Sequence, residues 1–254
     1  DLPYMSERFI EQQFLKFTHP EFSLQLAKKV VYSKIRNQRT LLRRNAGSII
    51  SNALEQLKML SEKVEEAVSI DQLRGIEGIA AKVYFESFPS MFKNNIDGYD
   101  VMKGRNRRPP KDPVNALLSL GYTLMVRDFQ AACASVGLDA MLGFYHRPEA
   151  GRPALVLDMM ETYRPIIVDS IVLRAFNTGE ISLDDFYLGP DSCSLKTNGR
   201  KAFFALYERR MHDKITDPTF GYKISYRRMI ELHMRMLARY IEGELADFIP
   251  LMTR

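Results

Sequence analysis

Apolar residues recur at intervals of three and four along most of the chain, and this spacing predicts a protein built mainly from α-helices. Residues 49–68 illustrate the pattern, because charged residues fall outside a single apolar stripe formed by Ile50, Leu54, Leu57, Val64 and Val68. Only the stretch near 187–197, with the turn residues Gly189-Pro190-Asp191, predicts a short β-hairpin. The expected fold class is therefore mainly α, with many helices and one small hairpin.

Capping residues and prolines predict where several helices begin and end. Ser69-Ile70-Asp71-Gln72 has the order of a capping box, so we expect a helix from there to about Phe88, where Pro89 ends it. Asp112-Pro113 has the order of an N-cap followed by a first-turn proline, and predicts a long helix that ends near Gly137. Loops are expected at 97–110 and 137–152.

The second half of the chain continues the helical pattern. A long helix is expected from Pro153 to about Phe176, with a kink or a restart at Arg164-Pro165. Two more helices are expected at 199–212 and 222–248.

Length and composition narrow the class of protein. The 254 residues are 46% hydrophobic, enough for one large core or two smaller ones, and no apolar run approaches the roughly 18 residues of a membrane span. The start of the chain lacks the pattern of a secretory signal. Its two cysteines, Cys133 and Cys193, show no zinc-binding spacing, and this favours a protein of the reducing cytoplasm without structural zinc.

Charge is segregated along the chain, which has a formal net charge of +5 and a pI near 9.1. No acidic residue occurs between Glu21 and Glu55, or between Asp100 and Asp112. Segregated positive charge favours a polyanionic partner, most simply a nucleic acid, over an ordinary solvated surface. The candidate residues for contacts with its phosphates are Lys28, Arg36, Arg39 and Arg43 along one expected helix face, and Arg105, Arg107 and Arg108 in an expected loop.

Asp158 and Glu161 form the first part of a candidate metal site. They are three residues apart after an apolar run, so a helix places both carboxylates near one buried face. Buried carboxylates are usually paired with a cation or bind a metal ion. An ordinary arginine partner, Arg152 or Arg164, is the alternative to a metal.

Glu77 and His146 complete the candidate set. Glu77 lies in an expected helix between Gly75 and Gly78, each of which costs about 0.5–1 kcal/mol relative to alanine. We expect another backbone or a phosphate to approach there, and the alternative is tight helix packing around a solvated Glu77. Carboxylates with an imidazole favour Mg²⁺ or Mn²⁺, and the side chains must then meet within about 10 Å. Beside basic surfaces, such an ion indicates phosphodiester chemistry.

Two other functions are compatible with parts of this pattern. A non-catalytic helical nucleic-acid-binding protein would use the same carboxylates only in salt bridges. A di-metal carboxylate oxidase is set aside, because the sequence contains no Glu-x-x-His motif.

Three motifs occur in an order that resembles the Cas-one family of CRISPR spacer-acquisition integrases. They are Gly75-Ile76-Glu77-Gly78-Ile79-Ala80-Ala81, then Gly143-Phe144-Tyr145-His146 with Gly151-Arg152-Pro153, then Leu157-Asp158-Met159-Met160-Glu161 with Arg164-Pro165. The upstream Lys34-Ile35-Arg36-Asn37-Gln38 also resembles that family. The resemblance extends from about residue 20 to about residue 240.

The resemblance implies a helical catalytic domain at residues 21–254 and a metal-dependent DNA endonuclease and integrase. In that reaction the 3′-hydroxyl of a captured DNA fragment attacks a phosphodiester of the repeat array. Glu77 and His146 would be metal ligands, and the third would be Glu161, or Asp158 as the alternative, since many members have aspartate where Glu161 stands.

The resemblance also implies a small N-terminal β domain that dimerises the protein, and no such pattern occurs in this sequence. Residues 1–20 would then be a linker or the trailing end of that domain. The implied partners are DNA, a Cas-two dimer, a Cas-four nuclease and, with the N-terminal domain, a second copy of the chain. The implied location is the prokaryotic cytoplasm.

Overall fold

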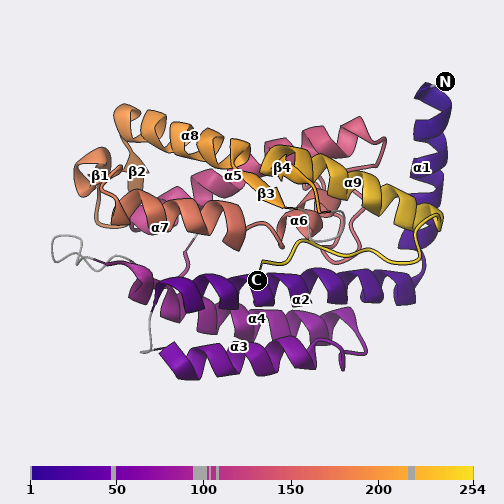
Figure 1. The fold of residues 1–254 in the computed structure, drawn as a ribbon, viewed down its shortest axis with the longest axis horizontal. Coiled ribbons are helices and arrows are strands. Elements are labelled where there is room, and N and C mark those ends of the chain that lie inside the picture. Colours follow the sequence, from indigo (N-terminus) through magenta and orange to yellow (C-terminus); the bar gives the residue numbers. More distant parts are fainter. Residues whose placement is uncertain are drawn as a thin grey trace.

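The computed structural model describes residues 2–46, 50–93, 102, 104–106, 109–216 and 221–253. The mainly α class is confirmed, since helices dominate the described part of the chain and its strands form two small hairpins (Figure 1). In chain order the helical elements are α1 (Leu2–Phe17), α2 (Pro20–Asn45), α3 (Ser51–Lys63), α4 (Ile70–Ser87), η2 (Phe88–Met91), α5 (Pro113–Ser135), α6 (Ala154–Met160), η3 (Pro165–Asp169), α7 (Ser170–Asn177), η4 (Leu183–Asp185), α8 (Thr197–His212) and α9 (Tyr226–Glu242).

The helices form two layers (Figure 1). The first contains α2, α3 and α4, which pack side by side, and the second contains α5, α7, α8 and α9. Helix α2 is also in contact with α6 and η3, so it joins the first layer to the second. Helix α1 stands at one end of the molecule and packs against α9 and α2.

The predicted caps begin the helices that carry the site. The Ser69 hydroxyl accepts a hydrogen bond from the backbone N–H of Gln72 at 3.2 Å, and the Gln72 side chain accepts from the N–H of Val68 at 2.9 Å. Asp112 Oδ1 accepts from the N–H of Asn115 at 2.7 Å. Helices α4 and α5 therefore begin where the sequence predicted.

The break at Pro165 is confirmed, and it divides one expected helix into three pieces. Proline has no N–H to donate, so the α-helical ladder that began in α6 cannot continue through it. The chain continues as a π-helical segment in η3, where the N–H of Asp169 donates to the carbonyl of Arg164 at 3.0 Å. Glu161 and Arg164 consequently lie in the turn between α6 and η3.

The β-hairpin near 187–197 is confirmed: β1 (Phe186–Leu188) pairs antiparallel with β2 (Cys193–Leu195). A second hairpin, β3 (Lys214–Thr216) with β4 (Lys223–Ser225), was not predicted, and it corrects the expected helical start at 222. Helix α9 begins instead at Tyr226, which follows the Ser225 cap, and ends at Glu242, before Gly243 with φ of 81°.

The stripe predicted for residues 49–68 is wrong at its end. Helix α3 stops at Lys63, and Val68 is 82% exposed rather than part of the core. The turn at 64–66 leads directly to the Ser69 cap of α4, so Val68 lies outside both helices.

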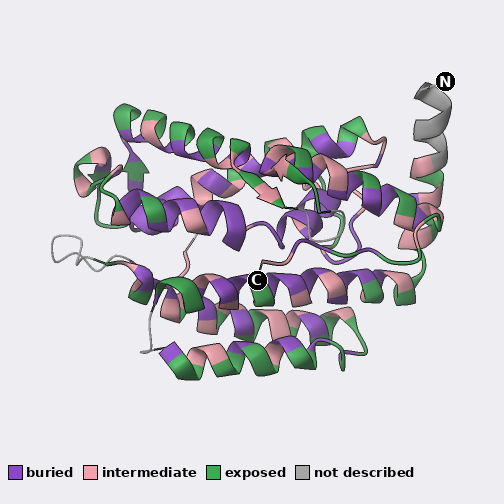
Figure 2. Cartoon of the chain, viewed as in Figure 1, coloured by how far each residue is buried: buried purple, intermediate pink, exposed green. Residues whose placement is uncertain are grey.

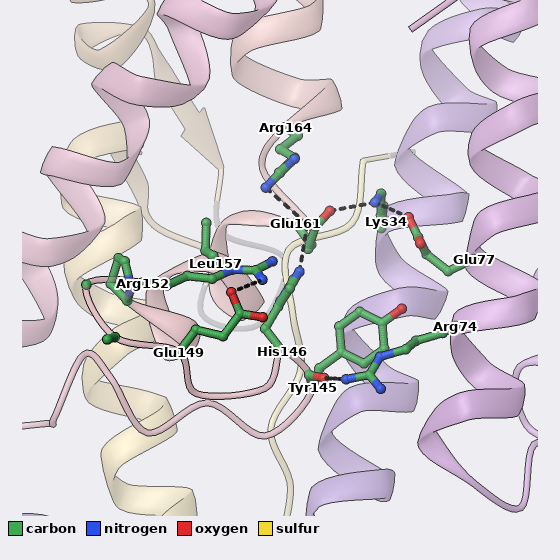
Figure 3. Close-up of a pocket in the computed structure, with 13 residues that line it drawn as sticks. Lys34, Arg74, Glu77, Tyr145, His146, Glu149, Arg152, Leu157, Glu161 and Arg164 are labelled. Carbon is green, nitrogen blue, oxygen red and sulfur yellow. Dashed lines mark hydrogen bonds and ion pairs between the residues drawn. The ribbon is translucent and has the colours of Figure 1, made fainter. Parts of the chain in front are cut away.

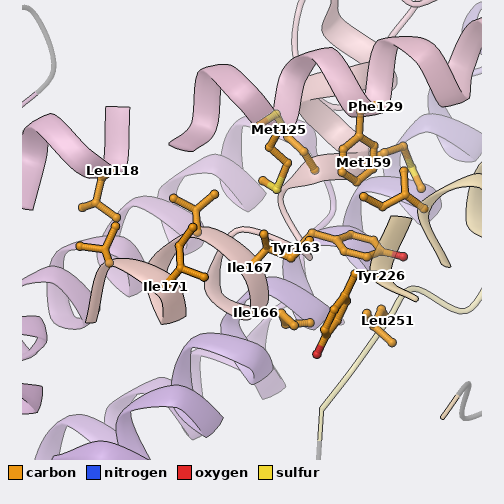
Figure 4. Close-up of a cluster of buried hydrophobic side chains, with 14 of the residues drawn as sticks. Leu118, Met125, Phe129, Met159, Tyr163, Ile166, Ile167, Ile171, Tyr226 and Leu251 are labelled. Carbon is orange, nitrogen blue, oxygen red and sulfur yellow. The ribbon is translucent and has the colours of Figure 1, made fainter. Parts of the chain in front are cut away.

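Buried residues line the surfaces where the two layers meet (Figure 2). At the centre of the second layer, the Tyr163 ring meets the Phe129 ring edge-on with centroids 5.2 Å apart, and Met159 and Ile167 are buried nearby (Figure 4). Burying such a side chain stabilises the fold by about 1.5–3 kcal/mol. The Tyr163 hydroxyl also forms a hydrogen bond with His233 Nδ1 at 2.8 Å, which fixes the turn that carries Glu161.

Helix α1 is attached to the rest of the fold by Gln13, whose side chain is fully buried. Its Nε2 donates to the carbonyls of Asp139 and Leu142 at 2.8 and 2.9 Å, and its Oε1 accepts from the N–H of Asp139 at 2.8 Å. The described part of residues 1–20 is mostly helix. Its assignment as a linker or as the end of an N-terminal domain stays a prediction. Among the helices described, none has the length and apolar content needed to cross a bilayer.

Candidate metal-binding and catalytic site

Three helical segments bring Lys34, Glu77 and Glu161 together. Lys34 comes from α2, Glu77 from α4 and Glu161 from the turn after α6 (Figure 3). The Lys34 ammonium lies 2.5 Å from Glu77 Oε1 and 2.6 Å from Glu161 Oε2. Two carboxylates from distant parts of the chain thus share one cation.

Glu161 is the most enclosed member of the cluster, with 4% of its surface exposed. Arg164 lies 3.1 Å from Glu161 Oε1, and His146 Nε2 lies 3.9 Å from the same oxygen. Burial alone would raise the pKa of Glu161, but Arg164 and Lys34 outweigh burial and lower that pKa to about 2. The carboxylate is therefore ionised at neutral pH.

Asp158 orients His146 and the loop that carries it. Asp158 Oδ2 accepts hydrogen bonds from the backbone N–H groups of Phe144 and Tyr145 at 2.6 and 2.9 Å. Its Oδ1 accepts from the N–H of His146 at 2.8 Å and lies 2.7 Å from His146 Nδ1. An ionised carboxylate can only accept, so Nδ1 carries a proton, and Nε2 is the ring nitrogen that faces Glu161.

Gly143 allows this loop to lie against the start of α6. A Cβ atom at position 143 would come within 2.7 Å of the backbone carbon of Ala154, so a larger residue would push the two segments apart. The loop then reaches Gly151, whose φ of 74° favours glycine.

Asn37 links α2 to the turn that holds Glu161. Its side-chain amide donates to the carbonyls of Thr162 and Leu251 at 2.9 and 2.8 Å, and its Oδ1 accepts from the N–H of Thr253 at 2.9 Å. This residue lies one helical turn from Lys34, so α2 positions both the lysine and the turn opposite it.

The cluster opens into a cavity of about 1020 Å³. Arg74 lies at its edge, donates to the Tyr145 carbonyl at 2.8 Å and lies 5.8 Å from the centroid of the Tyr145 ring. The charged and histidine residues that line the cavity are Lys34, Arg74, Glu77, His146, Glu149, Arg152, Glu161 and Arg164.

A second polar network lies behind Arg164. The Arg164 guanidinium lies 4.7 Å from the centroid of the Tyr122 ring. The Tyr122 and Tyr84 hydroxyls donate to the two oxygens of Asp169 at 2.6 and 2.7 Å. Burial raises the pKa of Asp169 to about 6, despite both hydroxyl donors.

The side chains of the cluster fit a divalent ion, although Lys34 stands between them. As placed, no group of three or more His, Cys, Asp or Glu side chains in the described part of the chain is arranged to hold a metal. The Lys34 ammonium is a stand-in cation at that position, 2.6 Å from the buried Glu161 Oε2. Two carboxylates and one imidazole nitrogen within about 10 Å suit Mg²⁺ or Mn²⁺.

The model of the family described as "CRISPR associated protein Cas1" matches residues 4–209. The chain belongs to the Cas1 family. It is 45% identical over 251 residues to the CRISPR-associated exonuclease Cas4/endonuclease Cas1 fusion of Geobacter sulfurreducens, covering 95% of this chain and 45% of that protein. It is 35% identical over 242 residues to the CRISPR-associated endonuclease Cas1 3 of Thermus thermophilus, covering 95% of this chain and 70% of that protein.

The fold is also similar to that of a solved partial Cas6-RT-Cas1–Cas2 complex. The TM-score is 0.84 at 30% identity, covering 96% of this chain and 73% of the matched chain. The chain spans less than half the length of the Geobacter sulfurreducens fusion. The family model and these relatives establish the Cas1 family for this chain.

Gly75 and Gly78 of this Cas1 chain lie on an open side of α4. A Cβ atom at either position would meet nothing within 4 Å among the described residues. The expected approach of another backbone of this chain is therefore wrong, while the expected approach of a phosphate stays a prediction.

Of the basic residues predicted along one face of α2, some make contacts inside the fold and others are exposed. Lys28 donates to the Glu65 carbonyl at 2.7 Å, and Arg39 Nε donates to the Leu54 carbonyl at 2.9 Å. Arg36 and Arg43 are exposed. This corrects the expectation of one free stripe, because α3 and the turn after it cover part of that face of α2.

The second predicted basic cluster is described only in part. Arg105 donates to Asn115 Oδ1 at 2.6 Å and lies 5.6 Å from the centroid of the Tyr122 ring, so it is engaged within the fold. Arg107 and Arg108 lie outside the described residues.

Arg164 and Lys34 are more central to the site than the sequence indicated. Arg164 was named as the alternative to a metal, and it does pair with Glu161, while Arg152 pairs with Glu149 at 3.1 Å. Lys34 was noted only as one cation of the acid-free segment between Glu21 and Glu55 and as part of a motif that resembles the Cas1 family. Its contact with Glu77 joins α2 to α4, and no local pattern indicates such a contact.

Proposed function

We propose that this chain is the catalytic part of a metal-dependent DNA endonuclease and integrase that inserts captured DNA into a CRISPR repeat array. The observation that carries the proposal is that Glu77 and Glu161 share one cation, the Lys34 ammonium, while His146 Nε2 lies 3.9 Å from the other oxygen of Glu161, all at the wall of one large cavity. In the proposed reaction a DNA 3′-hydroxyl attacks a phosphodiester, so one P–O bond forms and another breaks.

In this proposal Glu77, Glu161 and the Nε2 atom of His146 hold Mg²⁺ or Mn²⁺. A bound ion supplies stabilisation of charge on the attacking and leaving oxygens. Asp158 holds the His146 ring through Nδ1 and is a positioning residue, since its oxygens already accept from the ring and three backbone N–H groups. This division favours Glu161 over Asp158 as the third ligand.

The cavity cations supply the contacts that a DNA backbone requires. Arg74 and Arg152 line the cavity, and Arg147 beside them is exposed. Guanidinium groups bind phosphate oxygens in pairs and position a strand without reading its sequence. On α2, we propose phosphate contacts for Arg36 and Arg43.

We infer the partners from the names of the relatives. One relative is a fusion of Cas4 with Cas1, and one similar structure is a complex that includes Cas1 and Cas2. The proposed partners are therefore DNA, a Cas2 dimer and a Cas4 nuclease. We further propose a homodimer in the presence of the family's N-terminal domain, and a location in the prokaryotic cytoplasm.

A non-catalytic helical nucleic-acid-binding protein is the second candidate. It is favoured by the pairing of Lys34 with both Glu77 and Glu161, because these ion pairs neutralise the carboxylates without any metal. In that case the cluster would only join α2, α4 and the turn after α6.

Strand transfer and DNA binding by single variants separate the two candidates. Glu77→Ala and His146→Ala should abolish Mn²⁺-dependent strand transfer and leave DNA binding nearly intact. Glu86→Ala is the matched control, because Glu86 is an exposed glutamate of the same helix. Equal loss of both activities in Glu77→Ala and His146→Ala would instead support the structural role.

A further inference from the structure

We propose that Lys34 is an internal counter-ion that occupies the cation position between Glu77 and Glu161 until a divalent metal ion displaces it. Lys34 would thereby weaken metal binding and set the metal concentration at which the site is loaded. This inference rests on the metal-dependent function proposed above.

The geometry of the ammonium differs from that of an ordinary surface salt bridge. The Lys34 side chain is 10% exposed, and its two partners come from α4 and from the turn after α6 (Figure 3). Its contact with the buried Glu161 Oε2 is close, at 2.6 Å. The ammonium therefore occupies a position between two carboxylates, as a bound metal ion would.

The charge of the cluster indicates that Lys34 and a divalent ion compete. The cluster contains three carboxylates, Glu77, Asp158 and Glu161, and two permanently charged cations, Lys34 and Arg164. With His146 neutral, the cluster carries one net negative charge with Lys34 in place and two without it. A divalent ion thus balances the cluster only when the ammonium has left, since like charges repel strongly at a buried position.

Lys34 and Arg164 both line the large cavity, but they differ in how firmly they are held. The flexible four-carbon stem of Lys34 can turn the ammonium toward the open space. The Arg164 guanidinium is held between Glu161 and the Tyr122 ring. The displaced ammonium would then face the space where a DNA phosphate is expected.

The test is the affinity of the full chain for Mn²⁺ without DNA, measured by titration calorimetry or by the spin-resonance signal of free Mn²⁺. Lys34→Met and Lys34→Gln should each lower the Kd for Mn²⁺ at least about tenfold. Lys29→Met is the matched control, because Lys29 lies on the same helix and pairs with Asp247 at 2.6 Å, outside the cavity. Its Kd should stay within about twofold of the wild-type value.

A merely structural Lys34 gives the opposite sign, since loss of a structural ion pair would disorder the ligands and raise the Kd. An unchanged or higher Kd in the folded Lys34→Gln protein would overturn the inference. Glu161→Gln separates this failure from failure of the proposed function. If Glu161→Gln binds Mn²⁺ as well as the wild type does, the metal site itself is misassigned, and the proposed role of Lys34 is then wrong too.

Discussion

Glu161 and Asp169 are two buried carboxylates in the same short stretch of chain, and their environments differ in charge. Glu161 is 4% exposed and Asp169 is 1% exposed. Arg164 and Lys34 flank Glu161, so its pKa falls to about 2 in spite of burial. Asp169 accepts from two neutral tyrosine hydroxyls, and burial raises its pKa to about 6.

This difference shows that burial alone does not determine the role of a carboxylate. Burial raises the pKa of both groups, but Glu161 has Lys34 at 2.6 Å and Arg164 at 3.1 Å. The more modest influence of Arg164 and Arg105 on Asp169 does not offset its burial. Glu161 is therefore held as an anion at the wall of a cavity and is suited to bind a cation. Asp169 joins α4, α5 and η3 through Tyr84 and Tyr122, which is a structural role.

The largest expected effect is the loss of strand transfer on substitution of Glu161. Removing one metal ligand should cost about 4 kcal/mol of transition-state stabilisation. Because each 1.36 kcal/mol changes the rate tenfold, Glu161→Gln should slow the reaction about a thousandfold. Asp169→Asn is the matched variant and should slow it by less than about tenfold. Single-turnover strand-transfer assays with Mn²⁺ measure both rates. Similar losses in the two variants would contradict the division of roles.

The next effect concerns stability against pH. Below about 3.9, the unfolded-state pKa, Asp169 is protonated in both states, and between about 4 and 6 only the folded state keeps the proton. Wild-type stability should therefore fall as the pH rises through this window, by about 3 kcal/mol in total from this group.

Asp169→Asn should remove this fall, because asparagine does not titrate. Urea unfolding of both proteins between pH 4 and 7 gives the comparison. Parallel curves for the two proteins would show that another group dominates this window.

A smaller effect is expected from the two tyrosines that bind Asp169. Tyr84→Phe and Tyr122→Phe each remove a hydrogen bond to a buried carboxylate and should lower the free energy of unfolding by about 1.5–3 kcal/mol at neutral pH. Tyr187→Phe, at an exposed position, should change it by less than about 0.5 kcal/mol. Unchanged stability in both buried variants would mean that water replaces the lost hydroxyls.

The smallest expected effect is on DNA binding, and it compares exposed cations of α2 with a cation that is bonded within the fold. Arg36→Ala with Arg43→Ala should reduce the slope of log K against log salt for DNA binding by about 2, with little change in stability. Lys28→Met should leave that slope unchanged and lower stability, since Lys28 donates to the Glu65 carbonyl. A slope that changes only with Lys28 would reverse the assignment.

Local features of the sequence predicted much of the helical framework. Ser69 and Asp112 cap α4 and α5 by contacts within three residues, and Pro165 interrupts a helix through its own missing N–H. The grouping of Glu77, His146 and Glu161 as metal ligands was expected from motifs that resemble the Cas1 family, and it stays a prediction. These signals need no knowledge of the rest of the fold.

Contacts between distant segments could not be predicted. Lys34 reaches Glu77 and Glu161 only because α2 lies between α4 and the turn after α6. The β3–β4 hairpin was missed because three-residue strands are too short to show a clear alternation, and the apolar spacing that follows favoured a single helix from 222. The covering of Lys28 by the turn at Glu65 likewise depends on how α2 and α3 pack.

The shared acceptor Asp158 has a consequence for amide hydrogen exchange. Loop amides usually exchange quickly with water, but the N–H groups of Phe144, Tyr145 and His146 all donate to this one buried carboxylate. They can reach solvent only when the loop leaves α6, so the three should exchange slowly and at a common rate. Slow exchange of these three loop amides would show that the loop stays attached to Asp158 and that His146 is held in place.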